Sequence, residues 1–228
     1  MQKTRIIIVG AGKLAQAIRA STQLASNREV SNWETFDKHN LAASIVIHAG
    51  SGRQLDEVID FCADSKSTLI ELATGTSTEH RPINFPTIIC SNTALALVKF
   101  MFMLSTSGAL FKDYKITVEE SHQATKGSVP GTAVDIAHSL GVPAGDIVSC
   151  RDTDEQEWRL GIPTAFLAGH AFHRIAIQDG DSSIVFETKV LGHRPYVEGV
   201  IAIVKAIENN SLEPRKYAVI DFVRSGWI

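Results

Sequence analysis

The chain of 228 residues has few cysteines, no long apolar run and no excess of basic charge. Its three cysteines, Cys62, Cys90 and Cys150, lie far apart and form no CxxC pair, which argues against a disulfide framework or a zinc site. No apolar run approaches the roughly 18 residues of a membrane span, and the start turns glycine-rich too early for a signal peptide. Lys and Arg number 22 against 25 Asp and Glu, so we expect a cytoplasmic protein with neither a nucleic-acid nor a membrane partner.

The order of apolar segments along the chain favours an α/β fold. Hydrophobic residues make up 44% of the sequence and charged residues 21%, as in ordinary globular proteins. In the N-terminal part, short apolar runs alternate with helical spacing, which predicts a doubly wound sheet of parallel strands. The expected strands are 5–9, 44–48, 68–72 and 87–90, and the clearest helix between them is 54–63.

From about residue 93 the pattern changes to that of an α+β domain. A long apolar helix to residue 110 precedes segments whose residues alternate between polar and apolar, as in an open-faced sheet. The expected elements are strands 114–120, 171–178 and 183–190, with helix 132–140 between them and a hairpin at Asp179-Gly180-Asp181. Helix 197–207 and a last buried strand 217–223 follow, and this tail could rejoin the first sheet.

A glycine turn follows the first expected strand. Gly10-Ala11-Gly12-Lys13-Leu14-Ala15 fits G-x-G-x-x-A between a strand and a helix, the context that a dinucleotide site requires. Glycines let the backbone approach a pyrophosphate, and the helix start offers N–H groups. We therefore predict cofactor contacts at Gly10, Gly12, Lys13 and Leu14; the alternative is a glycine turn that binds no nucleotide.

An acid at the end of a plausible second strand, which would precede segment 44–48, would complete such a site by accepting hydrogen bonds from a ribose. Glu34 lies 24 residues after Gly10, and Asp37 competes with it. Lys38 beside these acids could meet a 2′-phosphate, so both NADH and NADPH stay open as cofactors.

A second informative segment runs from Glu120 to Ala133. It holds His122 and Lys126 in a polar loop, then Thr132 at the start of a helix, where backbone N–H groups suit a carboxylate. Lys126 supplies a cation and His122 a group that titrates near neutrality. Two solvated surface residues are the alternative. His170 and His173 face opposite sides of a strand without a nearby carboxylate, so we expect no metal site.

This segment resembles the E-x-H-H-x-x-K-x-D-x-P-S-G-T-A signature of the 4-hydroxy-tetrahydrodipicolinate (dihydrodipicolinate) reductases, NAD(P)H-dependent oxidoreductases of diaminopimelate and lysine biosynthesis. Leu69–Thr76 is similar to the family's G-T-T-G strand end, and Ser91-Asn92 to its A-x-N-F-S segment near the nicotinamide. Gly169–Ile175 is similar to its G-x-H-x-V strand. The resemblance therefore extends over essentially the whole chain.

The resemblance implies a role for each matching residue. His122 occupies the place of the catalytic acid, and Lys126 that of the lysine that holds the substrate and assists protonation. Gly131 and Thr132 would hold a substrate carboxylate, with Gln123 beside them. The further cofactor contacts that the resemblance implies are Gly75, Thr76, Ser91 and Asn92.

Several positions depart from the family pattern. Gln123 replaces the second His, Ser128 replaces the Asp, and P-S-G-T-A has contracted to Pro130–Ala133. The first hypothesis is reduction of 4-hydroxy-tetrahydrodipicolinate to tetrahydrodipicolinate. The alternatives are a relative that reduces another cyclic imine or conjugated acid, and a dinucleotide-sensing protein that has lost catalysis.

The expected architecture is a Rossmann dinucleotide-binding domain of residues 1–93 plus 195–228. A substrate-binding and oligomerisation domain of α+β type, residues 94–194, is inserted in it. We expect closure about hinges near Asn92–Ala94 and Gly192–Tyr196. The resemblance implies a homotetramer that acts on a ring dicarboxylate.

Overall fold

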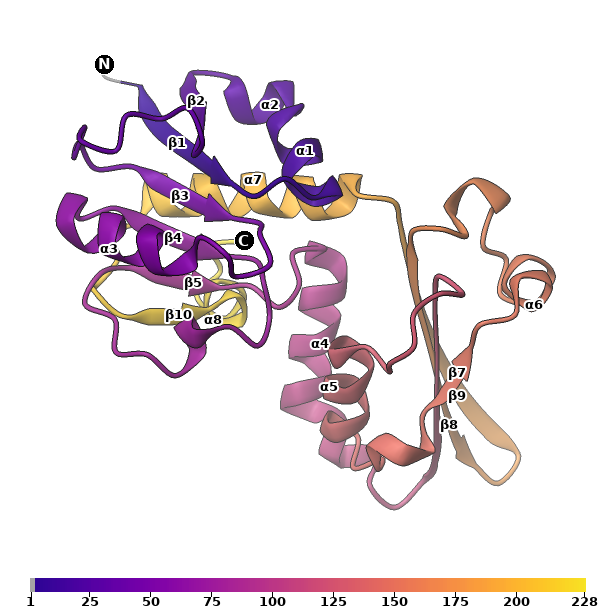
Figure 1. Cartoon of the computed structure of the whole chain (residues 1–228). Helices are drawn as coiled ribbons and strands as arrows, with labels where there is room; N and C mark the ends of the chain where they lie inside the picture. Colours follow the sequence, from indigo (N-terminus) through magenta and orange to yellow (C-terminus); the bar gives the residue numbers. More distant parts are fainter. Residues whose placement is uncertain (1–2) are drawn as a thin grey trace. The chain divides into compact units, whose positions relative to one another are not determined.

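The structure is a computed structural model that describes residues 3–228. The chain divides into two compact units (Figure 1). The first unit comprises Met1–Leu95 and Tyr196–Ile228, and the second unit is Ala96–Pro195. Among residues 3–228, no helix is both long and apolar enough to cross a membrane.

The first unit is built on a six-stranded sheet in the order β10-β5-β4-β3-β1-β2, with every neighbouring pair parallel. β1 lies between β2 and β3, so the strand order reverses beside β1. The predicted doubly wound α/β sheet is therefore confirmed. The strands are β1 (Thr4–Val9), β2 (Arg28–Asn32), β3 (Ile45–His48), β4 (Thr68–Glu71), β5 (Thr87–Ile89) and β10 (Lys216–Ala218).

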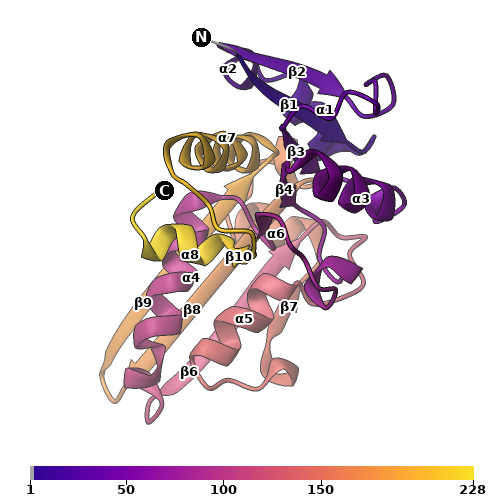
Figure 2. The same cartoon turned by 90° about the vertical axis from the view of Figure 1, so that its left-hand side faces the viewer.

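Helices cover both faces of this sheet because its central strands are apolar on both sides. Helix α3 lies on one face and α7 on the other (Figure 2). Under α3, Trp33 packs edge-on against Phe61, with ring centroids 5.6 Å apart. The helices are α1 (Lys13–Arg19), α2 (Thr22–Ala25), α3 (Leu55–Ser65), α7 (Arg194–Asn209), α8 (Val219–Arg224) and the 3₁₀ turn η1 (Ser77–Glu79).

The last segment corrects one prediction. The expected strand 217–223 rejoins the sheet beside β5 as β10, but it ends at Ala218, where α8 begins. The side chain of Asp221 accepts a hydrogen bond from the Ala218 backbone N–H at 2.9 Å, which caps the helix. Val219 and Phe222, three residues apart, are both buried. A short apolar run does not distinguish a buried strand from a buried helix, which is why the sequence misled here.

The second unit contains a four-stranded sheet in the order β7-β6-β8-β9. β8 and β9 form a long antiparallel hairpin, and β7, which the sequence did not predict, pairs in parallel with β6. The strands are β6 (Lys115–His122), β7 (Val148–Cys150), β8 (His170–Asp179) and β9 (Ser182–Leu191). The helices are α4 (Leu95–Ser107), α5 (Gly131–Ser139), α6 (Thr153–Trp158) and the 3₁₀ turns η2 (Gly108–Phe111), η3 (Ala144–Asp146) and η4 (Thr164–Phe166).

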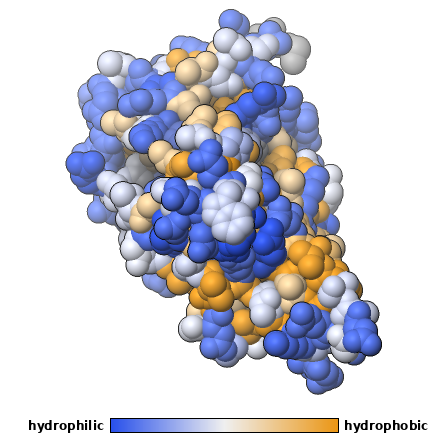
Figure 3. All heavy atoms as spheres, turned by 90° about the vertical axis from the view of Figure 1, so that its right-hand side faces the viewer, coloured by the Kyte–Doolittle hydropathy of each residue, from blue (hydrophilic) through white to orange (hydrophobic). Residues whose placement is uncertain are grey.

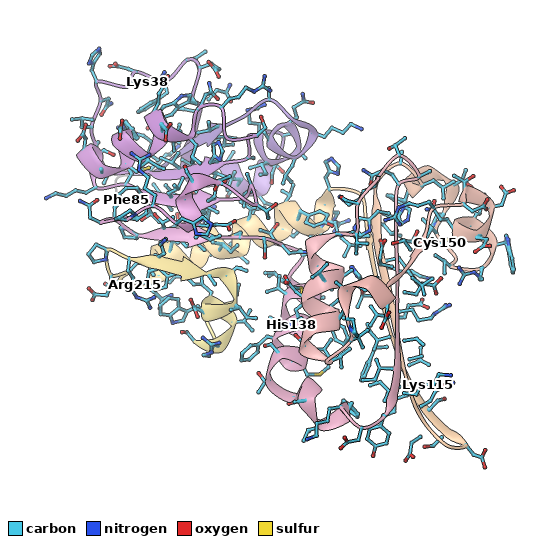
Figure 4. The ribbon with its side chains drawn as sticks, turned by 60° about the horizontal axis from the view of Figure 1, so that its bottom comes forward. Lys38, Phe85, Lys115, His138, Cys150 and Arg215 are labelled. Carbon is cyan, nitrogen blue, oxygen red and sulfur yellow. The ribbon has the colours of Figure 1, made fainter. Side chains whose placement is uncertain are left out.

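Helices α4 and α5 lie on one face of this sheet (Figures 1 and 2). Phe100 of α4 contacts Phe186 of β9 at a centroid distance of 5.5 Å. On the opposite face, Phe172 packs with Leu160 and Ile162. β9 leaves Ile184 and Val185 half exposed (45% and 56%), and Figure 3 shows apolar side chains gathered on one part of the surface.

Candidate functional site

A cavity of about 770 Å³ lies in the first unit at the carboxyl ends of β1 and β3. This is the point where the strand order reverses, which is where ligands bind in open α/β sheets. It brings together three of the residues predicted to bind a cofactor, namely Gly10, Gly12 and Glu34. The remaining lining residues are Ala11, His48, Ala49, Gly50, Ser51, Arg53 and Gln54.

The glycine turn is shaped by the loop that follows β3. Gly10 has a φ of +112°, and a Cβ placed on it would lie 2.6 Å from the carbonyl oxygen of Ala49. Only glycine fits there. Gly12 differs, because nothing lies within 4 Å of its Cβ position and its φ of −71° suits any residue. The Arg19 guanidinium holds the turn by donating to the Gly10 carbonyl at 2.7 Å.

Of the two acids that the sequence left open, Glu34 lines the cavity. The Gln54 amide donates a hydrogen bond to its carboxylate. Asp37 instead accepts a hydrogen bond within its own turn, from the backbone N–H two residues on. Lys38 lies 4.8 Å over the Trp33 ring. Arg53 is the arginine that lines the cavity, and no sequence motif pointed to it.

The other predicted cofactor residues lie at the same edge of the sheet but outside the lining of this cavity. Gly75 and Thr76 follow β4, and Ser91 and Asn92 follow β5. Gly75 has a φ of +68°, and its N–H donates to the Glu79 carboxylate at 2.7 Å. Lys13 and Leu14 form the first turn of α1.

Two buried titratable side chains lie beneath the cavity. His48 ends β3 and Glu71 ends β4, and the two are paired in register. His48 Nδ1 is 2.8 Å from Glu71 Oε1, and their side chains are 1% and 0% exposed. The expected strand 44–48 ends at His48, and nothing in the sequence indicated its partner.

In the second unit, a buried carboxylate holds the predicted catalytic histidine. His122 is the last residue of β6, and its Nδ1 lies 2.9 Å from Glu120 Oε2. Arg151 donates to the other oxygen of Glu120 at 2.6 Å, and Ser149 donates to it as well. The Glu120 side chain is fully buried, whereas that of His122 is 14% exposed.

The protonation state of Glu120 follows from these contacts. Burial is the largest influence and raises its pKa, but the hydrogen bonds from His122, Arg151 and Ser149 together lower the pKa to about 2. Near neutral pH the carboxylate is therefore ionised and can only accept hydrogen bonds. His122 must donate to it through Nδ1, which leaves Nε2 as the nitrogen that can exchange a proton with a substrate.

The loop after β6 is anchored to the same group of side chains. Arg151 Nε donates to the Lys126 carbonyl at 3.0 Å, and Gln156 Nε2 donates to the His122 carbonyl at 2.8 Å. Within the loop, the Lys126 N–H donates to the Gln123 carbonyl at 2.9 Å. One turn, held in place by these hydrogen bonds, therefore contains three of the predicted site residues: His122, Gln123 and Lys126.

The other two predicted substrate residues begin α5. Pro130 is its N-cap residue, and Gly131 and Thr132 form its first turn, where N–H groups point away from the helix. Nothing lies within 4 Å of the Cβ position of Gly131. This helix start is sterically open and suits a carboxylate.

Two further histidine rings neighbour His122. The His173 ring is 5.9 Å from it and the His170 ring 6.5 Å, measured between centroids. Burial lowers the pKa of His173 to about 4, and burial also lowers the pKa of His170. Both rings are therefore neutral near pH 7. His170 bonds Ser121 and His173 bonds Thr188, and residues 3–228 contain no group of three side chains arranged to hold a metal.

The residues that sequence reasoning missed come from distant segments. Ser149 belongs to β7, Arg151 directly follows that strand, and Gln156 belongs to α6. The sequence predicted neither β7 nor α6. Glu120 was part of the recognised segment but had been given no role. Its position two residues before His122 on a strand, hence on the same face, was the available signal.

No family model matches the chain, but sequence comparison finds relatives. A probable 4-hydroxy-tetrahydrodipicolinate reductase of Oryza sativa subsp. japonica is 35% identical over 127 residues, which cover 51% of this chain and 37% of that protein. A plant reductase of this name from Arabidopsis thaliana is 35% identical over 127 residues, 51% of this chain and 36% of its own. The matched part thus spans little more than a third of these plant relatives.

A third relative covers most of the chain. The 4-hydroxy-tetrahydrodipicolinate reductase of Methanoregula boonei is 26% identical over 234 residues, which cover 87% of this chain and 88% of that protein. The names of these relatives confirm the family resemblance that the motifs indicated.

Solved structures share the fold. Dihydrodipicolinate reductase from Paenisporosarcina sp. TG-14, bound to dipicolinate, matches with a TM-score of 0.66 and 15% identity over 95% of this chain and 98% of its own. An engineered D-amino acid dehydrogenase matches with a TM-score of 0.54 and 11% identity over 96% and 94%. At these identities the likeness concerns the fold alone, and it agrees with the predicted Rossmann-like class.

Proposed function

We propose, from its likeness to the 4-hydroxy-tetrahydrodipicolinate reductase family, that this protein reduces 4-hydroxy-tetrahydrodipicolinate to tetrahydrodipicolinate. The substrate gains a hydride and a proton and loses water, while NADH or NADPH becomes NAD⁺ or NADP⁺. The reaction belongs to diaminopimelate and lysine biosynthesis. The observation that carries the proposal is the His122–Glu120 pair beside the Lys126 loop.

The residues around the cavity of the first unit fit a nicotinamide dinucleotide. The open Cβ position of Gly12 leaves room for a diphosphate to approach the backbone. Glu34, held by Gln54, is suited to accept hydrogen bonds from ribose hydroxyls. When bound, the reduced cofactor supplies a hydride. A carboxylate at Glu34 favours NADH, since it repels a 2′-phosphate.

His122 supplies the proton. Its Nδ1 proton is committed to the ionised Glu120, so the exchangeable proton sits on Nε2. Arg151 and Ser149 keep Glu120 anionic, and an anionic partner stabilises a protonated imidazole. The neutral rings of His170 and His173 add no competing positive charge near pH 7.

The substrate carboxylates are held by the loop and the helix start that follow. The Lys126 ammonium orients a ring carboxylate and favours electron gain at the ring. Gly131 and Thr132 offer backbone N–H groups to a carboxylate at the start of α5, and Gln123 offers an amide beside His122. A ring dicarboxylate is the substrate class because dipicolinate is the compound bound in the similar reductase structure.

A homotetramer is part of the proposal. The edge strand β9 exposes Ile184 and Val185. Apolar groups exposed on an unpaired strand are commonly covered by association with another subunit. Sedimentation of the purified chain tests this, with a monomer as the contrary result.

The activity is tested by following NADH and NADPH oxidation with freshly generated 4-hydroxy-tetrahydrodipicolinate. Three variants accompany the unaltered chain: His122→Ala, Lys126→Ala and the double variant. We expect turnover by the unaltered chain and a loss of kcat of roughly two to four orders of magnitude in His122→Ala. Lys126→Ala should also raise KM, because it removes a carboxylate contact.

The results separate the hypotheses. Turnover that persists unchanged in both single variants contradicts the assigned roles. Cofactor binding with no oxidation by the unaltered chain rejects the named substrate, and other cyclic imines and conjugated acids are then tested on the same protein.

A further inference from the structure

The buried His48–Glu71 pair takes no part in the proposed proton transfer. Glu71 Oε1 accepts from His48 Nδ1 at 2.8 Å and from the Ala73 backbone N–H at 2.8 Å. Both side chains come from the ends of neighbouring strands and are essentially without solvent exposure. The imidazole is therefore fixed in one orientation, because turning it would break its buried hydrogen bond to the carboxylate.

The second nitrogen of this ring, Nε2 of His48, is buried and has no hydrogen-bond partner among residues 3–228. Buried polar atoms in folded proteins are almost always paired, so this nitrogen indicates a partner outside the chain. A Cβ on Gly50 would lie 2.9 Å from Nε2, so any larger residue there would press against the ring. His48 also belongs to the lining of the cavity.

The position of His48 relative to the glycine turn identifies the ligand group. The residue after it, Ala49, donates to the Val9 carbonyl at 2.9 Å, and its own carbonyl is the atom that a Cβ on Gly10 would strike. The segment 48–50 therefore lies against the turn at which this type of fold holds a diphosphate.

We propose that His48 binds the diphosphate of the dinucleotide through Nε2, with Glu71 as the residue that positions it. In the imidazolium form both ring nitrogens donate, Nδ1 to Glu71 and Nε2 to a phosphate oxygen. The carboxylate of Glu71 offsets the buried positive charge. This inference rests on the proposed binding of a nicotinamide dinucleotide.

The other charged side chains at the cavity do not fill this role. Arg53 is exposed and is bonded only through Nε to Ser51, at 3.3 Å, among the contacts of the described residues. An exposed cation of this kind adds electrostatic attraction but does not set the direction of a hydrogen bond. Glu34 carries a negative charge and is suited to the ribose. Unlike these two side chains, His48 is oriented by Glu71, so it can donate a hydrogen bond in a fixed direction.

The test compares ADP-ribose, which carries the diphosphate, with adenosine, which does not. His48→Asn retains a polar atom near the Nδ1 position but lacks Nε2, and His48→Gln places an amide near the Nε2 position. The control is His39→Asn, which changes an exposed histidine of the same unit. Binding is measured on the full-length chain by calorimetry for ADP-ribose and by NMR titration for adenosine.

We expect His48→Asn to weaken ADP-ribose binding about tenfold or more, the usual effect of removing a hydrogen bond to a charged group. Adenosine affinity should stay unchanged, and His48→Gln should recover part of the loss. Equal ADP-ribose affinity in His48→Asn and the unaltered chain overturns the proposal. An equal loss for both ligands also overturns it, because the effect is then general to the fold.

A second measurement needs no variant. In the unaltered chain labelled with ¹⁵N-histidine, the Nε2 resonance of His48 should shift when ADP-ribose is added and stay in place when adenosine is added. An unmoved resonance in a chain that binds ADP-ribose overturns the inference. If the unaltered chain binds neither ADP-ribose nor NADH, the proposed function itself fails, and the two failures are thus distinguished.

Discussion

The carboxylate of Glu120 accepts the Nδ1–H of His122 at 2.9 Å from a position with no solvent exposure. Because the same carboxylate accepts from Arg151 and Ser149, it is ionised at neutral pH and fixes which nitrogen of His122 carries the proton toward it. This arrangement resembles the orientation of catalytic histidines by carboxylates in other enzymes.

Glu120→Gln should lower kcat by about 10- to 100-fold with little change in KM, because the substituted amide keeps the shape but not the charge. The control is Glu119→Gln, which removes the neighbouring carboxylate, one that pairs with Arg159 instead. Equal kcat values for the two variants contradict the positioning role.

Gly10→Ala and Gly12→Ala should fail in different ways. A Cβ at Gly10 meets the Ala49 carbonyl at 2.6 Å and φ is +112°, so this variant should lose several kcal/mol of folding free energy, on the order of 2–4. Gly12→Ala meets nothing in the chain and should keep its melting temperature while losing affinity for NADH. Thermal unfolding and calorimetry measure the two effects. Normal NADH binding by Gly12→Ala places the diphosphate elsewhere.

Glu34→Ala should reduce the preference for NADH over NADPH. The carboxylate lines the cavity and is oriented by Gln54, so its removal takes away an acceptor for ribose hydroxyls and a repulsion toward a 2′-phosphate. We expect the ratio of kcat/KM for NADH to that for NADPH to fall by about tenfold. Asp37→Ala, which changes the competing acid outside the cavity lining, should leave the ratio as it was.

The stability of the folded chain should fall as the pH drops from 6.5 to 4. Burial lowers the pKa of His173 in the folded chain to about 4 from the ordinary value of 6.5, so in this window the unfolded chain binds a proton that the folded chain does not. The loss at pH 5 is on the order of 2 kcal/mol.

Urea unfolding at pH 7 and pH 5 measures this difference, and His173→Gln should show a smaller drop than the unaltered chain. His39→Gln is the control, because His39 is exposed. At still lower pH, protonation of Glu120 adds a second loss, present between its ordinary pKa of 4.5 and about 2. Identical pH dependence in the His173 variant and the unaltered chain contradicts the prediction.

Much of the fold was readable from local patterns. The β-branched run before Gly10 and the alternation of apolar strands with helices indicated the parallel sheet, because burial on both faces requires continuous apolar strands. Where the pattern was ambiguous it failed: the run after Tyr217 becomes helix α8 beyond Ala218, since periodicity cannot separate short buried strands from helices. The three-residue strand β7 was too short to leave a signal.

The sequence by itself determined which residues lie in turns suited to a dinucleotide and to a carboxylate. Local spacing along the chain was enough to identify Gly10, Gly12, His122 and Lys126. Only the tertiary structure decided which side chains support them. Arg151 reaches Glu120 from 31 residues away, and Glu71 reaches His48 from 23. Strand register and burial determine these partners. A buried charge needs a hydrogen-bonding or charged partner, and the fold supplies one from whichever segment lies beside it. Local sequence spacing does not encode such a contact.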